Sequence, residues 1–232
     1  MPTTRRNFLS SSSKLLAASS LAGLTTSPLL QDQSMKNISA ADKINIALIG
    51  CRSMGYGDLQ NALKVAGVEC AAICDVDDEI LKNRSAEISK IQGKSPLHYK
   101  DYRKLMENKD IDAVIIGTPD HWHCLPFVAA CQAGKDIYVE KPLANSIGEC
   151  DLMVTAARKY NRIVQVGQQQ RSGVHWKQAM DFMNAGNIGE LRKVNIWSNF
   201  NYGVGQPKVP DETPPPGVDF DMWLGPAPQR TF

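Results

Sequence analysis

Glu140, Lys141 and Pro142 form the triplet of this sequence that is best suited to chemistry. It directly follows a short apolar run, 137–139, which has the composition of a strand. A lysine amine at the end of a strand can exchange a proton with a substrate hydroxyl or carbonyl, and desolvation lowers the pKa of such a lysine toward neutrality. We therefore take Lys141 as the candidate catalytic residue.

A glycine-rich turn, Gly-Cys-Arg-Ser-Met-Gly at 50–55, is the second chemical signal. A dinucleotide-binding fingerprint has glycine at the first, third and sixth positions, and here Arg52 takes the third. The first glycine suits a tight turn, and the sixth lets a helix pack closely on a strand. The candidate phosphate-binding residues are Gly50, Arg52, Ser53, Met54 and Gly55.

Asp75 stands at the end of the next apolar run, 20 residues after Gly55. A carboxylate in that place can bind the adenosine ribose hydroxyls, and it favours NAD over NADP. NADP stays open as the alternative, because the Arg52 guanidinium could meet a 2′-phosphate or neutralise the pyrophosphate. A plain helix-entry carboxylate is the other interpretation of Asp75.

The elements that must position these residues alternate between strand and helix patterns. Apolar runs at 44–49, 68–74, 111–116, 136–139 and 162–166 predict strands, and helical patterns separate them, including 120–133 and 146–160. Such alternation predicts an α/β fold: a Rossmann-type, doubly wound parallel sheet over 43–167. Because ligands bind beyond the carboxyl ends of such strands, the glycine turn, Asp75, Thr118-Pro119 and Glu140-Lys141 should share one rim.

The pattern changes after Gly167. A helix is predicted at 175–185 and an alternating strand at 191–200, followed by a proline-rich stretch at 207–216. One strand and a long loop cannot bury themselves. We expect residues 168–232 to be the incomplete start of an α+β substrate and oligomerisation domain with a mostly antiparallel sheet.

These motifs together resemble the Gfo/Idh/MocA oxidoreductases, within their exported, twin-arginine subgroup. The resemblance runs from about residue 43 to the end and is specific as a combination. It rests on the glycine turn 50–55, Asp75, Gly117-Thr118-Pro119-Asp120-His121-Trp122-His123, Glu140-Lys141-Pro142, 166–171 and 186–190.

The resemblance implies an NAD-dependent oxidoreductase that acts on a sugar or polyol and forms homo-oligomers through its second sheet. Lys141 matches the family's catalytic lysine, and its bond to Pro142 is often cis in the family. Glu140 would support Lys141 and touch the nicotinamide ribose. The remaining residues that the resemblance places at the cofactor are Thr118, Pro119, His123 and Gln169.

The sequence also departs from the family pattern. Arg52 replaces a glycine, Asp120 stands where asparagine is common, and the family's Asp-x-x-x-His pair does not follow Gly189. Two other functions therefore stay open. One is an NAD-dependent glycosidase on the same fold, and the other is a non-catalytic nucleotide- or sugar-binding protein.

The N-terminal segment 1–42 is predicted to be a twin-arginine export signal and linker. Arg5-Arg6 precedes Asn7-Phe8-Leu9 and a weakly apolar stretch, and residues 1–31 contain no acid. A disordered basic tail and a membrane anchor are the alternatives, although the apolar stretch is short for a span. We expect a periplasmic protein without a stable membrane span after export.

Bulk composition excludes some other classes of protein. The net charge of +2 gives no case for a nucleic-acid partner, and 43% hydrophobic residues allow a real core. The six cysteines lack disulfide-like or C-x-x-C spacing, so free buried thiols are expected. His121 and His123 point apart on a helix start, so no metal is expected; Trp197 and Trp223 are interpreted as core residues in preference to substrate-stacking ones.

Overall fold

The computed structural model describes residues 43–198, 207 and 209–232. The predicted export segment, 1–42, lies outside the described residues. No helix in the described part of the chain is long and apolar enough to cross a membrane.

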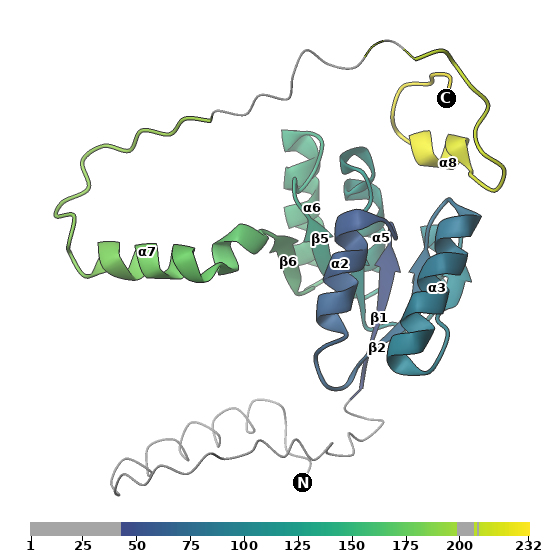
Figure 1. The fold of residues 1–232 in the computed structure, drawn as a ribbon, viewed down its shortest axis with the longest axis horizontal. Coiled ribbons are helices and arrows are strands. Elements are labelled where there is room, and N and C mark those ends of the chain that lie inside the picture. Colours follow the sequence, from purple (N-terminus) through teal and green to yellow (C-terminus); the bar gives the residue numbers. More distant parts are fainter. Residues whose placement is uncertain (1–42, 199–206, 208) are drawn as a thin grey trace, which may run out of the picture. The chain divides into compact units, whose positions relative to one another are not determined.

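A parallel sheet of six strands forms the centre of the domain (Figure 1). Its order is β3-β2-β1-β4-β5-β6, so the chain runs outward from β1 in one direction and from β4 in the other. Ligands of open sheets bind at this reversal, beyond the carboxyl ends. The strands are β1 (Ile44–Ile49), β2 (Val68–Cys74), β3 (Leu97–Tyr99), β4 (Ala113–Ile116), β5 (Asp136–Glu140) and β6 (Val164–Gly167).

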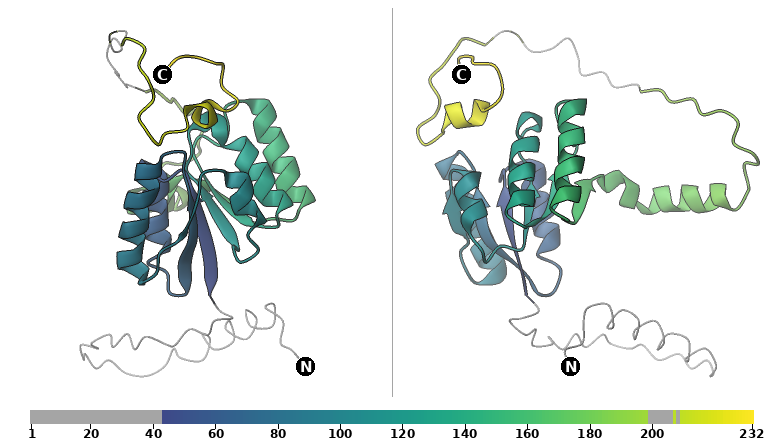
Figure 2. Two further views of the ribbon diagram at one scale, coloured as in Figure 1. Left: turned by 90° about the vertical axis from the view of Figure 1, so that its right-hand side faces the viewer. Right: turned by 180° about the vertical axis from the view of Figure 1, so that it is seen from behind.

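Helices cover both faces of this sheet, which confirms the predicted Rossmann-type architecture (Figure 2). Alternate residues of β1 point to opposite faces: Ile46 and Leu48 pack with α2 and α3, whereas Ala47 and Ile49 pack with α4, α5 and α6. The helices are α2 (Ser53–Ala62), α3 (Asp78–Gln92), α4 (Tyr102–Glu107), α5 (Cys124–Gln132), α6 (Ile147–Lys159), α7 (Val174–Asn184) and α8 (Phe220–Leu224), with 3-10 turns η2 (Asp120–Trp122) and η3 (Gln169–Ser172).

Local side-chain hydrogen bonds explain where some helices of the domain begin, among them α3 and α6. The Asp77 carboxylate accepts hydrogen bonds from the first turn of α3. Ser146 and Glu149 form a capping box that starts α6. These starts place the chain at the carboxyl edge of the sheet just before each helix, where the predicted site residues lie.

The structure differs from the sequence predictions in four respects. The helix expected over 120–133 is split into η2 and α5, and Pro126 is accommodated in the first turn of α5, where its missing N–H is not needed. The three-residue strand β3 was missed because so short a run has no periodicity. Residues 191–198 of the expected strand 191–200 form no strand, since no described segment pairs with them; residues 199 and 200 lie outside the described part. An antiparallel second sheet is likewise not seen among the described residues.

The cysteines are free thiols, as predicted, and five of the six are buried. Burial raises the pKa of the Cys51 and Cys74 thiols well above the ordinary value. Neutral, buried thiols are poor nucleophiles. The cysteines therefore act as small apolar side chains of the two cores.

Candidate functional site

A cavity of about 840 Å³ lies at the carboxyl ends of the central strands. Most of the predicted site residues line it, although they come from four separate loops. Three do not: Gly55, His123 and Gln169 lie behind the cavity wall. Those that line it are Gly50, Arg52, Ser53, Met54, Asp75, Thr118, Pro119, Glu140 and Lys141.

Three glycines make a close backbone contact at the floor of this cavity, which Gly50 and Gly117 line and Gly55 supports from behind. Gly50 has φ +85°, and a Cβ there would lie 2.7 Å from the Gly117 carbonyl. A Cβ on Gly55 would lie 2.5 Å from the Gly50 oxygen, and one on Gly117 would lie 2.5 Å from the Gly55 Cα. Each glycine therefore permits the backbone of the β1–α2 turn to rest on the end of β4. The contact leaves room above it for a ligand's phosphates at the start of α2.

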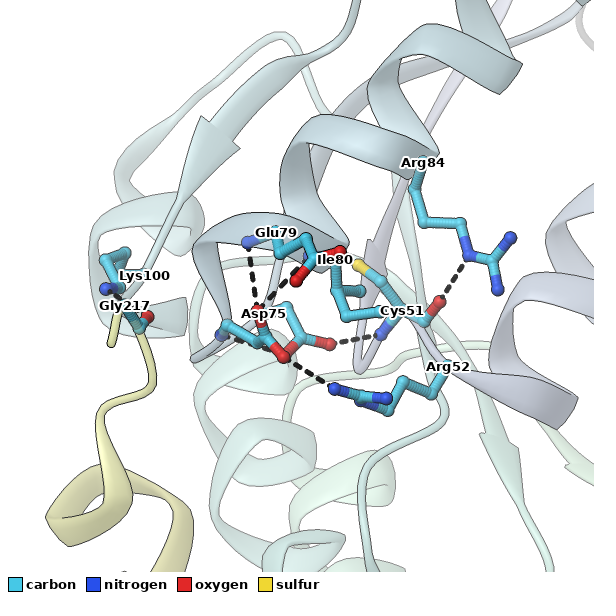
Figure 3. A network of polar contacts seen from close by, with 9 residues as sticks. Cys51, Arg52, Asp75, Glu79, Ile80, Arg84, Lys100 and Gly217 are labelled. Atoms are coloured by element: carbon cyan, nitrogen blue, oxygen red, sulfur yellow. Dashed lines mark hydrogen bonds and ion pairs between the residues drawn. The ribbon is translucent and has the colours of Figure 1, made fainter. Parts of the chain in front are cut away.

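Asp75 links the glycine turn to the loop that follows β2 (Figure 3). Its Oδ2 accepts a 2.7 Å hydrogen bond from the Cys51 N–H, and its Oδ1 accepts a 3.1 Å bond from the Asp77 N–H. Burial raises the pKa of Asp75, and these two N–H donors oppose that rise. A carboxylate has further lone pairs, so Asp75 can still accept hydrogen bonds from ribose hydroxyls.

Arg52 takes the third fingerprint position without straining the backbone. Its φ of −94° and ψ of 167° are extended values open to any residue, so glycine is not required there. Its guanidinium pairs with Asp77 at 2.5 Å and remains largely exposed. Asp77 is buried, but its carboxylate also accepts hydrogen bonds from the Glu79 and Ile80 N–H groups, so it keeps partners if the exposed guanidinium turns toward a bound phosphate.

Lys141 lies on the cavity wall immediately after β5. The Lys141–Pro142 peptide bond is cis, as the resemblance implied. Thr118, across the cavity floor, has a buried hydroxyl oxygen without a hydrogen-bond partner in the described structure. A buried polar atom of this kind is costly unless a ligand completes it. The orphaned hydroxyl, the glycine floor and Asp75 together fit a dinucleotide.

Glu140, the residue before Lys141, is a buried acid that lies next to a second acid, Asp58. It is 4% exposed and accepts a 2.8 Å hydrogen bond from the Gln169 amide. Asp58 of α2 faces it, and burial, followed by the charge of Glu140 and a hydrogen bond to it, raises the pKa of Asp58 to about 6. Asp58 Oδ2 lacks a donor when both acids are ionised. A proton on Asp58 removes this conflict, because the acid can then donate to Glu140.

His123 connects two of the site loops from behind. Its ring is 1% exposed, with Nδ1 2.6 Å from the Pro142 carbonyl oxygen and Nε2 2.8 Å from the Thr118 carbonyl oxygen. Both partners are carbonyl oxygens, so the ring meets them through whichever nitrogen carries a hydrogen. His123 thus positions the Thr118 loop against the turn after Lys141, and it does not line the cavity.

Sequence reasoning missed several site residues. Asp58 lies one helical turn after Gly55, on the face of α2 that packs on the sheet, and a lone acid on such a face is the signal that could have identified it. The segment after Gly217 also lines the cavity. Trp223, interpreted as a core residue, is half-buried in that wall, whereas Trp197 is 82% exposed. Among the described residues, His, Cys, Asp and Glu side chains form no group suited to a metal ion.

Comparison with protein families gives an independent assignment of the domain. The profile of the GFO_IDH_MocA group, described as "Oxidoreductase family, NAD-binding Rossmann fold", matches residues 44–168, more than half of the chain. A "Glycosyl hydrolase family 109 protein" of Shewanella pealeana is 30% identical over 210 residues. That match covers 82% of this chain and 45% of the relative, so the chain spans less than half the length of the relative.

Solved structures with the same domain fold include dehydrogenases. The myo-inositol 2-dehydrogenase from Lactobacillus plantarum is 26% identical, with a TM-score of 0.59 over 64% of this chain and 43% of that one. An NAD-binding oxidoreductase from Klebsiella pneumoniae is 27% identical, with a TM-score of 0.55 over 64% and 40%. The scyllo-inositol dehydrogenase from Lactobacillus casei, solved with NAD(H) and scyllo-inositol, is 23% identical and shares the fold.

The raised pKa of Asp58 predicts that stability falls as the pH rises from about 4 to about 6. An unfolded aspartate has a pKa of about 3.9, so in this interval the folded state binds more protons than the unfolded state, and raising the pH favours unfolding. Asp58→Asn should flatten this part of the profile, because the amide can donate to Glu140 at any pH. The measurement is the free energy of unfolding in urea from pH 4 to pH 8.

Asp151→Asn, at an exposed acid of α6, is the matched control and should follow the wild-type profile. If Asp58→Asn shows the same pH dependence of stability as the wild type between pH 4 and pH 6, Asp58 and Glu140 do not share a proton.

Proposed function

We propose, from the premise that the chain belongs to the oxidoreductase family with an NAD-binding Rossmann fold, that it transfers a hydride between NAD(H) and a hydroxyl-bearing carbon of a sugar or polyol. The observation that carries this proposal is the position of Lys141. It lies at the end of β5, on the wall of the cavity that Asp75 and the glycine turn share. NADP is the alternative cofactor.

When bound, the nicotinamide supplies a carbon that accepts or returns the hydride. The chain's own residues bind and orient the reactants. Asp75 and the start of α2 would hold the adenosine ribose and the pyrophosphate, which directs the nicotinamide toward β5. Lys141 would take the hydroxyl proton as the hydroxyl becomes a carbonyl, and return it in the reverse direction.

Glu140 has a supporting role in this proposal. Its buried carboxylate is held by Gln169 on one side and by Asp58 on the other. A fixed carboxylate one residue before Lys141 can accept a hydrogen bond from the nicotinamide ribose. The contacts of Glu140 with Gln169 and Asp58 would hold the carboxyl end of β5, and so the backbone of Lys141, in one position.

A glycosidase that uses the same hydride chemistry is the second candidate. The 30% identity to a glycosyl hydrolase family 109 protein favours it. In such a reaction the hydride leaves the sugar and returns to it, so a glycoside is cleaved without net formation of NADH. A non-catalytic binding protein would instead bind the ligand and show neither product.

Residues 168–232 are proposed to belong to a substrate and oligomerisation domain with a mostly antiparallel sheet. In the described part of this region, large apolar side chains are exposed, among them Trp176 and Phe182 on α7 and Ile196 beyond it. Such surfaces are typical of regions that pack against another domain or subunit. We propose the same region as the source of substrate choice and of a homo-oligomer.

Export to the periplasm by the twin-arginine route is also proposed. The support is the Arg5-Arg6 pair before Phe8-Leu9 and the weakly apolar stretch after them. This route carries folded proteins, which suits a domain whose thiols are free.

Asp75→Asn should lower the preference for NAD over NADP. The amide keeps the size of the side chain and removes the charge that repels a 2′-phosphate. Dissociation constants for both cofactors, measured by calorimetry, should show the NAD-to-NADP affinity ratio falling by about tenfold or more. Asp110→Asn, an exposed acid at the opposite edge of the sheet, is the control. A wild-type preference for NADP would contradict the role of Asp75 and favour Arg52 as a phosphate ligand.

Lys141→Met should lower turnover by about 10²–10⁴-fold, the usual contribution of general acid–base catalysis. It should keep its affinity for NAD, because the adenosine and pyrophosphate contacts lie on other loops. The experiment measures kcat with a panel of polyols and the NAD dissociation constant on one preparation. Normal kcat with weakened NAD binding would assign Lys141 to the cofactor alone.

The export signal is tested by fusing residues 1–42 to a reporter that is active only after folded export. Replacing Arg5 and Arg6 by lysine should abolish the reporter signal, because the pathway recognises the arginine pair. Replacing Lys14 by arginine, outside the pair, is the control. Export that survives the double replacement would refute the assignment.

A further inference from the structure

We propose that residues 217–232, which we call the strap, build the adenine subsite of the cofactor cavity. The strap follows the proline-rich stretch and includes α8. Its aromatic side chains would form the wall on which the adenine ring of NAD stacks. This inference rests on the NAD binding in the proposed function and adds a binding element from outside the matched region, 44–168.

The strap is attached on one side to the loop that follows Asp75. The Asp219 N–H donates to the Val76 carbonyl at 3.0 Å, and the Asp78 N–H donates to the Gly217 carbonyl at 3.2 Å. An antiparallel bridge links Asp77 and Val218 between these bonds. The strap therefore crosses the chain one residue beyond the carboxylate expected to bind the adenosine ribose.

A lysine adds a second contact on this side. The Lys100 amine donates to the Gly217 carbonyl at 3.1 Å (Figure 3) and pairs with Asp78 at 3.1 Å. The carbonyl of Gly217 thus has two donors. Three separate loops, after β2, after β3 and before α8, meet at this point of the cavity rim.

The strap is attached on its other side to the η2 turn. The Trp223 carbonyl accepts a 2.9 Å hydrogen bond from the Trp122 indole and lies 2.9 Å from His121 Nε2. Gly225 rests flat on the Trp122 ring, where an added Cβ would come within 2.0 Å of a ring carbon. Leu224 between them is fully buried. The strap is therefore fixed at both margins of the cavity.

Between these attachments the strap presents aromatic surface to the cavity. The Phe220 and Trp223 rings stack with centroids 5.7 Å apart, and Phe232 meets Phe220 edge-on at 5.1 Å. All three line the cavity, as does Arg230, whose guanidinium lies 5.9 Å from the Trp223 ring centroid. Flat aromatic faces beside a cation suit a planar, electron-rich heterocycle.

The position of the strap selects adenine over the substrate as its ligand. The strap contacts the loop after β2, whereas Lys141 follows β5, and β1 and β4 lie between these two strands. Strands are spaced by about 4.8 Å, so the two ends are roughly 14 Å apart. A dinucleotide that reaches from Asp75 toward Lys141 leaves its adenine on the side of the strap.

The test measures binding of three probes to the 232-residue chain by calorimetry: NAD, AMP and nicotinamide mononucleotide. Phe220→Leu and Trp223→Ala should each weaken the binding of NAD and of AMP by roughly 5- to 150-fold, the range for loss of base–aromatic stacking. The affinity for nicotinamide mononucleotide should not change. Gly225→Ala should act in the same way by lifting the strap from Trp122. The exposed α7 residues Phe182 and Trp176 supply the matched controls Phe182→Leu and Trp176→Ala.

The outcomes separate this inference from the proposed function. If the wild type binds NAD and the variants bind AMP as tightly as the wild type does, the inference about the strap is wrong and the proposed function stands. Variants that bind AMP more tightly would show that the strap obstructs the subsite, which also overturns the inference. A wild type that binds neither NAD nor AMP would overturn both. Phe220→Leu keeps the apolar bulk and secures the comparison if Trp223→Ala unfolds.

Discussion

The close backbone contact among Gly50, Gly55 and Gly117 is the constraint on which the rest of the site depends. Each of the three lacks the space for a Cβ, with the nearest atoms 2.5–2.7 Å away. This contact sets the distance between the β1–α2 turn and the end of β4, at the place where the sheet reverses direction. The cavity, the free start of α2 and the position of the Thr118 hydroxyl all follow from that distance.

Buried polar groups then lock the loops that the glycines bring together. Asp75 joins the glycine turn to the loop after β2, and His123 joins the Thr118 loop to the turn after Lys141. Both are satisfied by backbone groups, so their bonds hold the main chain itself in place. Glu140 differs, because its neighbour Asp58 is a second acid. The carboxyl groups of Asp58 and Glu140 therefore titrate as a coupled pair.

The central fold could be predicted from the sequence because its strands are apolar runs buried on both faces and separated by helical patterns. The rim residues could be predicted because parallel strands bring their carboxyl ends together. Contacts between distant segments could not be predicted: no local pattern places Asp58 opposite Glu140, or Gly225 on Trp122. The alternation of apolar residues at 191–198 did not predict a strand correctly. Such alternation indicates which side chains would be buried, but a strand forms only where a neighbouring segment supplies hydrogen bonds.

Gly225 and Trp122 constrain each other although they lie far apart in the chain. The Trp122 indole donates to the Trp223 carbonyl, and its ring occupies the space that a side chain at 225 would need. A helix of five residues has too few internal bonds to be stable alone. Its order must come from the Asp219 cap and from these contacts with the domain. Residues 217–232 therefore depend on contacts with the cofactor domain for their order, although they lie within the region proposed for the substrate domain.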